Sequence, residues 1–154
     1  MLFRSDFLNK VLTNELTAIN QYFLHGEMCG NWGYTLLHNE IRKHAIDEMK
    51  HAEQIIEHIL FLDGFPNLQR LGTLKIGETV PEQFKSDLGL EHEAVKLLTE
   101  AIEHCVTVGD FNTRAKLEVI LTSEEEHIDW IETQIETIKQ VGAENYLSQH
   151  MHQA

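Results

Sequence analysis

The protein has 154 residues, which is enough for one domain with a full hydrophobic core and too short for two. Its net charge is −13, and this excess of acid disfavours a general binder of nucleic acid or of anionic membranes, because phosphates would be repelled. A hydrophobic fraction of 42% and a charged fraction of 24% are typical of a folded chain. We therefore expect a single domain over residues 1–154, and the abundance of acids and of histidines suggests metal cations as partners.

The start of the chain and its cysteines indicate a compartment. The first ten residues, MLFRSDFLNK, contain three charged residues and no long apolar run, so they predict neither a signal peptide nor a membrane span. Cys29 and Cys105 are too few for a disulfide framework and too far apart for a Cys-x-x-Cys metal site. A reduced, cytoplasmic setting is the simplest interpretation.

The predicted elements are helices. Apolar residues recur every three or four positions over four long segments and a short fifth one, at residues 5–32, 35–62, 81–108, 111–140 and 144–152. Thr79 and Glu82 predict a capping box before the third helix, and Asp110 an N-cap for the fourth. The short connections within each pair predict two antiparallel hairpins, while the 18 residues from Asp63 to Val80 can cross the length of a bundle. This is an all-α, four-helix bundle with one long crossover connection and a short C-terminal fifth helix.

Each long helix places a glutamate within its apolar stripe, and two of these glutamates are followed three residues later by a histidine. The residues are Glu15, Glu48, His51, Glu91, Glu124 and His127. A buried carboxylate without a partner costs several kcal/mol, and no basic residue lies on the four stripes. Two divalent cations would balance the negative charge of four carboxylates, and the two imidazoles would be neutral ligands.

The same six residues form a repeat. Glu15 and Glu91 are 76 positions apart, as are Glu48 and Glu124, and as are His51 and His127. One helical hairpin therefore repeats the ligand pattern of the other, and this predicts two half-sites around an approximate two-fold axis. The donor types suit iron, manganese or zinc, and their spacing does not choose among these metals.

Longer stretches of the chain resemble the bacterioferritins, the haem-containing members of the ferritin family. The similar segments are NELTAINQYFLH (14–25), IDEMKHAEQIIEHILFLDGFPNLQ (46–69), IGE (76–78), SDLGLE (86–91), EEEHIDWIE (124–132) and ENYL (144–147). The resemblance implies a ferritin-like fold and a di-iron ferroxidase centre built from the six residues above. Glu48 and Glu124 would bridge the two ions, and Glu15 and Glu91 would be terminal ligands. Fe(II) would be oxidised by dioxygen or peroxide and stored as mineral in a hollow shell of 24 subunits.

Met49 follows Glu48 directly, so it points about 100° away from the metal-binding stripe. It shares a second apolar flank with Ile46 and Ile56, and the first helix has a matching flank that includes Phe23 and Leu24. A second apolar face indicates a partner subunit, where methionine can simply fill a gap. The resemblance implies more: Met49 and its two-fold mate would be the axial ligands of haem b between subunits. A bacterioferritin-associated ferredoxin as electron donor is likewise implied by the resemblance alone.

Other residues allow two interpretations. Tyr22 lies two helical turns after Glu15, where it can hydrogen-bond a ligand, donate an electron or serve as a core aromatic. His44 and Asp47 form a possible inner-surface iron site, although well-known bacterioferritins have a histidine where this chain has Lys43. We interpret the remaining histidines as mostly surface or polar-face residues: His25, His38, His58, His92, His104, His150 and His152.

Three alternatives to iron storage follow from the same pattern. A non-storage di-iron peroxidase or oxidase of the rubrerythrin type would use the same ligands, but such proteins carry a four-cysteine iron domain that two cysteines cannot build. A hydrocarbon-oxidising di-iron subunit needs a substrate cavity, for which the chain is short. A haem-binding structural helical oligomer would leave the complete six-residue set without a purpose. Co-assembly with a paralogous subunit is compatible with the sequence.

Overall fold

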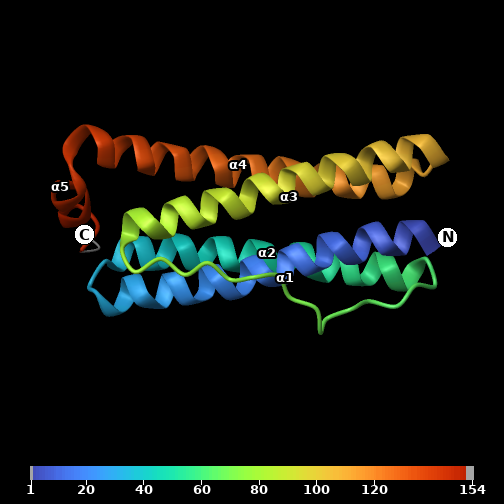
Figure 1. Ribbon diagram of the computed structural model, residues 1–154, viewed down its shortest axis with the longest axis horizontal. Helices are drawn as coiled ribbons and strands as arrows, with labels where there is room; N and C mark the ends of the chain where they lie inside the picture. Colours follow the sequence, from blue (N-terminus) through green and yellow to red (C-terminus); the bar gives the residue numbers. More distant parts are fainter. Residues whose placement is uncertain (1, 152–154) are drawn as a thin grey trace.

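The computed structural model describes residues 2–151 and confirms the all-α four-helix bundle (Figure 1). The helices are α1 (Leu2–Asn31), α2 (Thr35–Phe61), α3 (Val80–Val108), α4 (Phe111–Val141) and α5 (Ala143–Ser148). The helices α1 and α2 form one antiparallel hairpin and α3 and α4 form the other, with α5 at one end of the bundle. Among these helices, none is both long enough and apolar enough to cross a membrane.

The helix caps that the sequence predicts are formed. The Thr79 hydroxyl accepts a hydrogen bond from the Glu82 N–H at 3.3 Å, and the Glu82 carboxylate accepts one from the Glu78 N–H at 2.8 Å. The reciprocal bond of the capping box therefore reaches one residue before the N-cap. At α4, the Asp110 carboxylate accepts a bond from the Thr113 N–H at 3.2 Å. These bonds satisfy N–H groups that have no partner within the helix.

The fifth helix is shorter than the sequence predicts. It ends at Ser148, and the following N–H groups of Gln149 and His150 bond to carbonyls only three residues back. The His150 carbonyl then accepts a bond from the Leu36 N–H at 3.1 Å. A contact with the first turn of α2 therefore redirects the chain, and a periodic sequence pattern does not report such a distant contact.

The crossover between α2 and α3 runs alongside α1 (Figure 1). Its backbone is held by side chains that lie on one stripe of α1, four or eight residues apart. The accepting side chains and the crossover N–H groups are Asn9 with Asn67 (2.8 Å), Thr17 with Gly72 (2.8 Å), Gln21 with Lys75 (3.0 Å) and His25 with Gly77 (3.0 Å). We call these four residues of α1 the crossover ladder.

His25 is fully buried at the end of this ladder, so its interpretation as a surface histidine is wrong. Because Nε2 accepts the bond from Gly77, Nδ1 carries the proton and donates it to Asp87 at 2.9 Å. Gly77 is packed so closely that a Cβ atom there would collide with the backbone of Gln83. His58 is also buried, against Thr113, and corrects the same interpretation, while His152 lies outside the described residues.

The apolar core is divided into two clusters along the bundle axis. One contains residues such as Leu12, Ile55 and Leu98, and the other contains residues such as Ala18, Ala45 and Ile131. In the sequence of every long helix, the glutamates of the predicted site lie between residues of the two clusters. The core therefore encloses a layer of carboxylates near the middle of the bundle.

Candidate metal centre

All six residues of the predicted site are buried, and the structure brings them together. The four glutamates come from four different helices, and each is at most 1% exposed. The two histidines each lie one helical turn after a glutamate on the same face, because residues three apart are neighbours on a helix surface. The positions of these residues along the four helices thus bring six donor side chains together.

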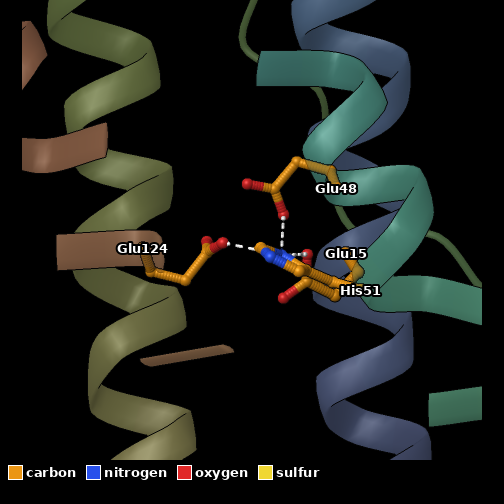
Figure 2. Close-up of side chains that lie close together, drawn as sticks. All are labelled: Glu15, Glu48, His51 and Glu124. Atoms are coloured by element: carbon orange, nitrogen blue, oxygen red, sulfur yellow. Dashed lines mark ion pairs between the residues drawn. The ribbon is translucent and has the colours of Figure 1, made fainter. Parts of the chain in front are cut away.

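The first half of the centre surrounds His51. Its Nδ1 lies 3.0 Å from a carboxylate oxygen of Glu124 and 3.5 Å from oxygens of both Glu15 and Glu48. Figure 2 shows the three carboxylates pointing toward the imidazole from different sides. One donor atom from each of these four residues fits within a span of 4.8 Å, which is compatible with a shared ion.

The second half surrounds His127. Its Nδ1 lies 3.0 Å from Glu48, 3.3 Å from Glu91 and 4.0 Å from Glu124. These four residues also offer donor atoms within 4.8 Å of one another. Glu48 and Glu124 belong to both groups, so they have the positions that bridging ligands between two cations require.

Most donor atoms of the cluster accept no hydrogen bond. Within residues 5–151, the buried side-chain atoms without such a partner are both carboxylate oxygens of Glu15 and of Glu48, single oxygens of Glu91 and Glu124, Nδ1 of His51, and Nε2 of His104. Seven of the eight atoms thus belong to the centre. Buried polar atoms normally find a partner, so this concentration fits a site built for cations.

The electrostatics of the protein alone agree with that assignment. Burial, followed by repulsion from Glu48 and Glu124, raises the pKa of Glu15 well above its ordinary value, and burial likewise raises the pKa of Glu48. Burial also raises the pKa of Glu91 to about 8. Burial would raise the pKa of Glu124, but the close approach of His51 and other neighbours outweighs it and lowers that pKa to about 2.

The pKa values of the two histidines shift in the direction opposite to that expected from burial alone. Burial lowers the pKa of His51, but the close carboxylates of Glu124 and Glu15 outweigh it and raise that pKa to about 9. The same balance, with Glu91 as the main partner, raises the pKa of His127 to about 9. Without cations the cluster therefore retains protons, and cations would replace them.

Further side chains contact the donors. The Tyr22 hydroxyl donates a hydrogen bond to Glu91, so the hydrogen-bonding role that the sequence allows for Tyr22 is present. The Nε2 atom of His127, which faces away from the glutamates, lies 3.0 Å from the carboxylate of Asp47. The ring of His44 stacks on that of His127 at 4.3 Å between centroids, and Trp130 packs edge-on against His44.

The two residues of the predicted inner-surface site therefore have partners already. Asp47 contacts His127, and Nε2 of His44 lies 3.4 Å from the carboxylate of Glu40. Sequence reasoning did not identify the contacts of Asp47 and Glu40. The position of Glu40 four residues before His44 is a signal for that pair, whereas nothing in the sequence alone relates Asp47 to His127.

Met49 lies outside the metal centre, on the outer face of the first hairpin. Its side chain is 49% exposed and is accompanied by exposed Phe23, Leu24 and Ile46. We call these four residues the outer apolar patch. Exposed apolar groups gathered on one hairpin are typical of a surface that another molecule covers.

Comparisons with known proteins agree with this architecture. The family model of the ferritin-like domain matches residues 5–141 of this chain. Bacterioferritin BfrA of Mycobacterium tuberculosis is 49% identical over 142 residues, which cover 92% of this chain and 89% of that protein. Bacterioferritin of Streptomyces coelicolor is 45% identical over 93% of this chain and 86% of its own length. Bacterioferritin of Rhodobacter capsulatus is 43% identical, with coverages of 92% and 88%.

Proposed function

Because the chain belongs to the bacterioferritin family of ferritin-like proteins, we propose that it is a ferroxidase that oxidises Fe(II) and stores the product as Fe(III) mineral. The observation that carries this proposal is the buried cluster of two overlapping donor groups that share Glu48 and Glu124. Carboxylate and imidazole donors suit iron, and the family selects iron among the metals that such donors accept.

In this proposal Glu15, Glu48, His51, Glu91, Glu124 and His127 hold two Fe(II) ions side by side. Each ion gives up one electron, so that a pair supplies the two electrons that reduce dioxygen to the level of peroxide, or peroxide to water. The glutamates would neutralise the added positive charge of the product. Tyr22, through its bond to Glu91, would orient that ligand, and an electron-donating role for Tyr22 stays a prediction.

The outer apolar patch supports a second part of the proposal. The exposed thioether of Met49 lies on an apolar surface, which is the donor and the environment that a haem between two subunits requires. Met49 and its two-fold mate would hold haem b through their thioether sulfurs. A haem bound there would supply electron transfer between a bacterioferritin-associated ferredoxin and the stored mineral.

We further propose that the chain assembles with copies of itself into a hollow shell of 24 subunits. The family supports a homo-oligomeric iron store, and the outer apolar patch offers a surface for one of its contacts. The cytoplasmic location and the inner-surface iron site at His44 and Asp47 stay predictions. Sedimentation of the purified protein tests the shell, since a stable monomer or dimer contradicts it.

The ferroxidase proposal is tested by adding Fe(II) to the purified protein in air and following the near-ultraviolet absorbance of Fe(III). Glu15→Ala and His127→Ala each remove a ligand from one half of the centre and should slow the oxidation strongly. Glu125→Ala is the matched control, because Glu125 adjoins Glu124 but is exposed. Equal rates for the wild type and both ligand variants would show that the cluster is not the oxidation site.

The haem proposal is tested separately by reconstitution with haem. The wild type should show the Soret spectrum of bis-methionine ligation, and Met49→Leu should lose it while Met28→Leu, which alters a half-buried methionine of α1, retains it. Equal spectra for the wild type and Met49→Leu contradict the assignment of Met49.

A further inference from the structure

The two halves of the metal centre contain the same donors but have different neighbours. Since the ligand pattern repeats after 76 residues, each residue that contacts one half has a related position beside the other half. A symmetric centre would have similar residues at both positions. Three residues that contact His127 or Glu91, namely Asp47, His44 and Tyr22, do not follow this rule.

His127 is held from two sides. Asp47 accepts a hydrogen bond from Nε2 at 3.0 Å, and Nδ1 lies 3.0 Å from Glu48 and 3.3 Å from Glu91. The ring of His44 covers one face of the His127 ring and is itself packed against Trp130. The orientation of the His127 imidazole is therefore fixed before a cation arrives.

His51 has no comparable support. The position related to Asp47 is Ser123, and the position related to His44 is Ile120. Within the described part of the chain, the contacts of His51 are those of Nδ1 with the three glutamates and a tilted contact with the ring of His127 at 6.5 Å, and Nε2 has no hydrogen-bond partner. The ring orientation of His51 is thus less restricted.

The terminal glutamates differ in the same direction. Tyr22 donates a hydrogen bond to one oxygen of Glu91, which orients that carboxylate while its Oε2 stays without a hydrogen-bond partner. The position related to Tyr22 is Leu98, which cannot donate a hydrogen bond. Among the described residues, neither oxygen of Glu15 accepts a hydrogen bond.

We propose that the two cation positions are inequivalent, and that the position of Glu91 and His127 fills first and binds more tightly than that of Glu15 and His51. A ligand held in its binding geometry loses less conformational entropy when a cation binds, and a carboxylate on the far nitrogen raises the basicity of a ligating imidazole. Asp47 is then a positioning residue that acts through His127. This inference rests on the proposed di-metal centre and adds an order of filling to it.

The test locates a single ion directly. Crystals of the whole assembly are loaded without oxygen with one Co(II) per chain, and the anomalous signal of cobalt is compared at the two positions. Most of the signal should lie beside Glu91 and His127. Equal signals would overturn the inequivalence and leave the di-metal centre intact, whereas no signal at either position would overturn the centre as well.

Asp47→Ala tests the cause. Loss of an outer hydrogen-bond partner typically costs about 10–100-fold in metal affinity, so calorimetric titration with Co(II) should show the tighter step weakened by about that factor. The ratio of the two anomalous signals should move toward one, Asp47→Asn should retain part of the preference through its carbonyl oxygen, and Ser123→Ala should leave the ratio unchanged. If Asp47→Ala weakens both steps equally, or neither, Asp47 does not position His127 and the proposal fails.

Discussion

The two helical hairpins of this protein repeat one another on their inner faces and differ on their outer faces. Inside, each contributes one glutamate and one Glu-x-x-His pair, 76 residues apart. Outside, the first hairpin carries Phe23, Leu24, Ile46 and Met49, whereas the related positions of the second hairpin are Thr99, Glu100, Thr122 and Glu125.

The difference separates two requirements. A pair of cations needs matching donors on both sides of the bundle, which preserves the repeat in the core. Assembly needs one defined surface, and a second apolar face on the other hairpin would create competing contacts. The polar residues at the four related positions thus prevent the second hairpin from forming the same contact.

The largest expected effect concerns the repeated inner face. Glu48→Ala and Glu124→Ala each remove a donor shared by both halves, so each should lower the initial rate of Fe(II) oxidation by more than about 100-fold, beyond the usual effect of outer hydrogen-bond partners. Stopped-flow absorbance of Fe(III) measures this. A variant of the pair that keeps the wild-type rate would show that the hairpins are not equivalent as sources of bridging ligands.

The next effect concerns protons in the metal-free protein. Between pH 4.5 and about 8, folded Glu91 retains a proton that the unfolded chain has lost, and His51 and His127 do the same between pH 6.5 and about 9. Stability therefore falls as the pH rises from about 5 to 9, since the folded state binds more protons there. The lowered pKa of Glu124 acts in the opposite sense, but only between about 2 and 4.5.

Urea unfolding of the metal-free protein at a series of pH values measures this decline, and bound cations should remove it because they replace the protons. Glu15→Gln removes a carboxyl group that is ionised in the unfolded chain but favours its protonated form when buried, so it should stabilise the metal-free protein at pH 8 while weakening metal binding. A metal-free stability that rises steadily up to pH 9 contradicts the proposed distribution of protons.

The outer faces are compared by exchanging residues between related positions. Leu24→Glu introduces the residue found at position 100 and should dissociate the assembly, because an unpaired charge in an interface costs several kcal/mol. Glu100→Leu is the reverse exchange and should leave the assembly intact. Sedimentation velocity distinguishes these outcomes, and an intact assembly of Leu24→Glu would exclude the outer apolar patch as a subunit contact.

The smallest effect concerns the crossover, which contacts α1 and has no counterpart on the second hairpin. His25→Ala leaves the buried Gly77 N–H without a partner and removes one of the two side chains that donate to the Asp87 carboxylate, the other being Gln21. This loss should lower the free energy of unfolding by about 1–3 kcal/mol. Asn20→Ala, an exposed change on the same helix, should have little effect. Chemical denaturation provides both values, and equal stability of the two variants would contradict a structural role for His25.

Much of this architecture could be predicted because local periodicity determines it. The apolar stripes identify the helices, and Glu15 or Glu91 is recognisable as a buried donor from its place on a stripe. The burial of His25 was not predicted, since a polar residue on a helix can face water or the backbone of a distant segment equally well. The regular four-residue spacing from Asn9 to His25 was nevertheless a signal of a polar stripe with a partner.

The contact between Asp47 and His127 could not be predicted for a different reason. It joins two helices whose relative rotation depends on the packing of the whole core, and no repeat relates the two residues. The end of α5 depends in the same way on a contact with Leu36.

The crossover ladder also affects how the sequence can change over time. Because α1 holds the crossover by its main-chain N–H groups, the ladder places no demand on most crossover side chains, and Phe65, Leu68, Leu71 and Leu74 are exposed. Substitutions should therefore be tolerated along much of this segment, apart from positions such as Gly77 where the backbone is closely packed. The four residues of the ladder, by contrast, should tolerate few substitutions, because their side chains accept the hydrogen bonds. The same set of hydrogen bonds would therefore allow the crossover sequence to vary and require these positions of α1 to stay constant.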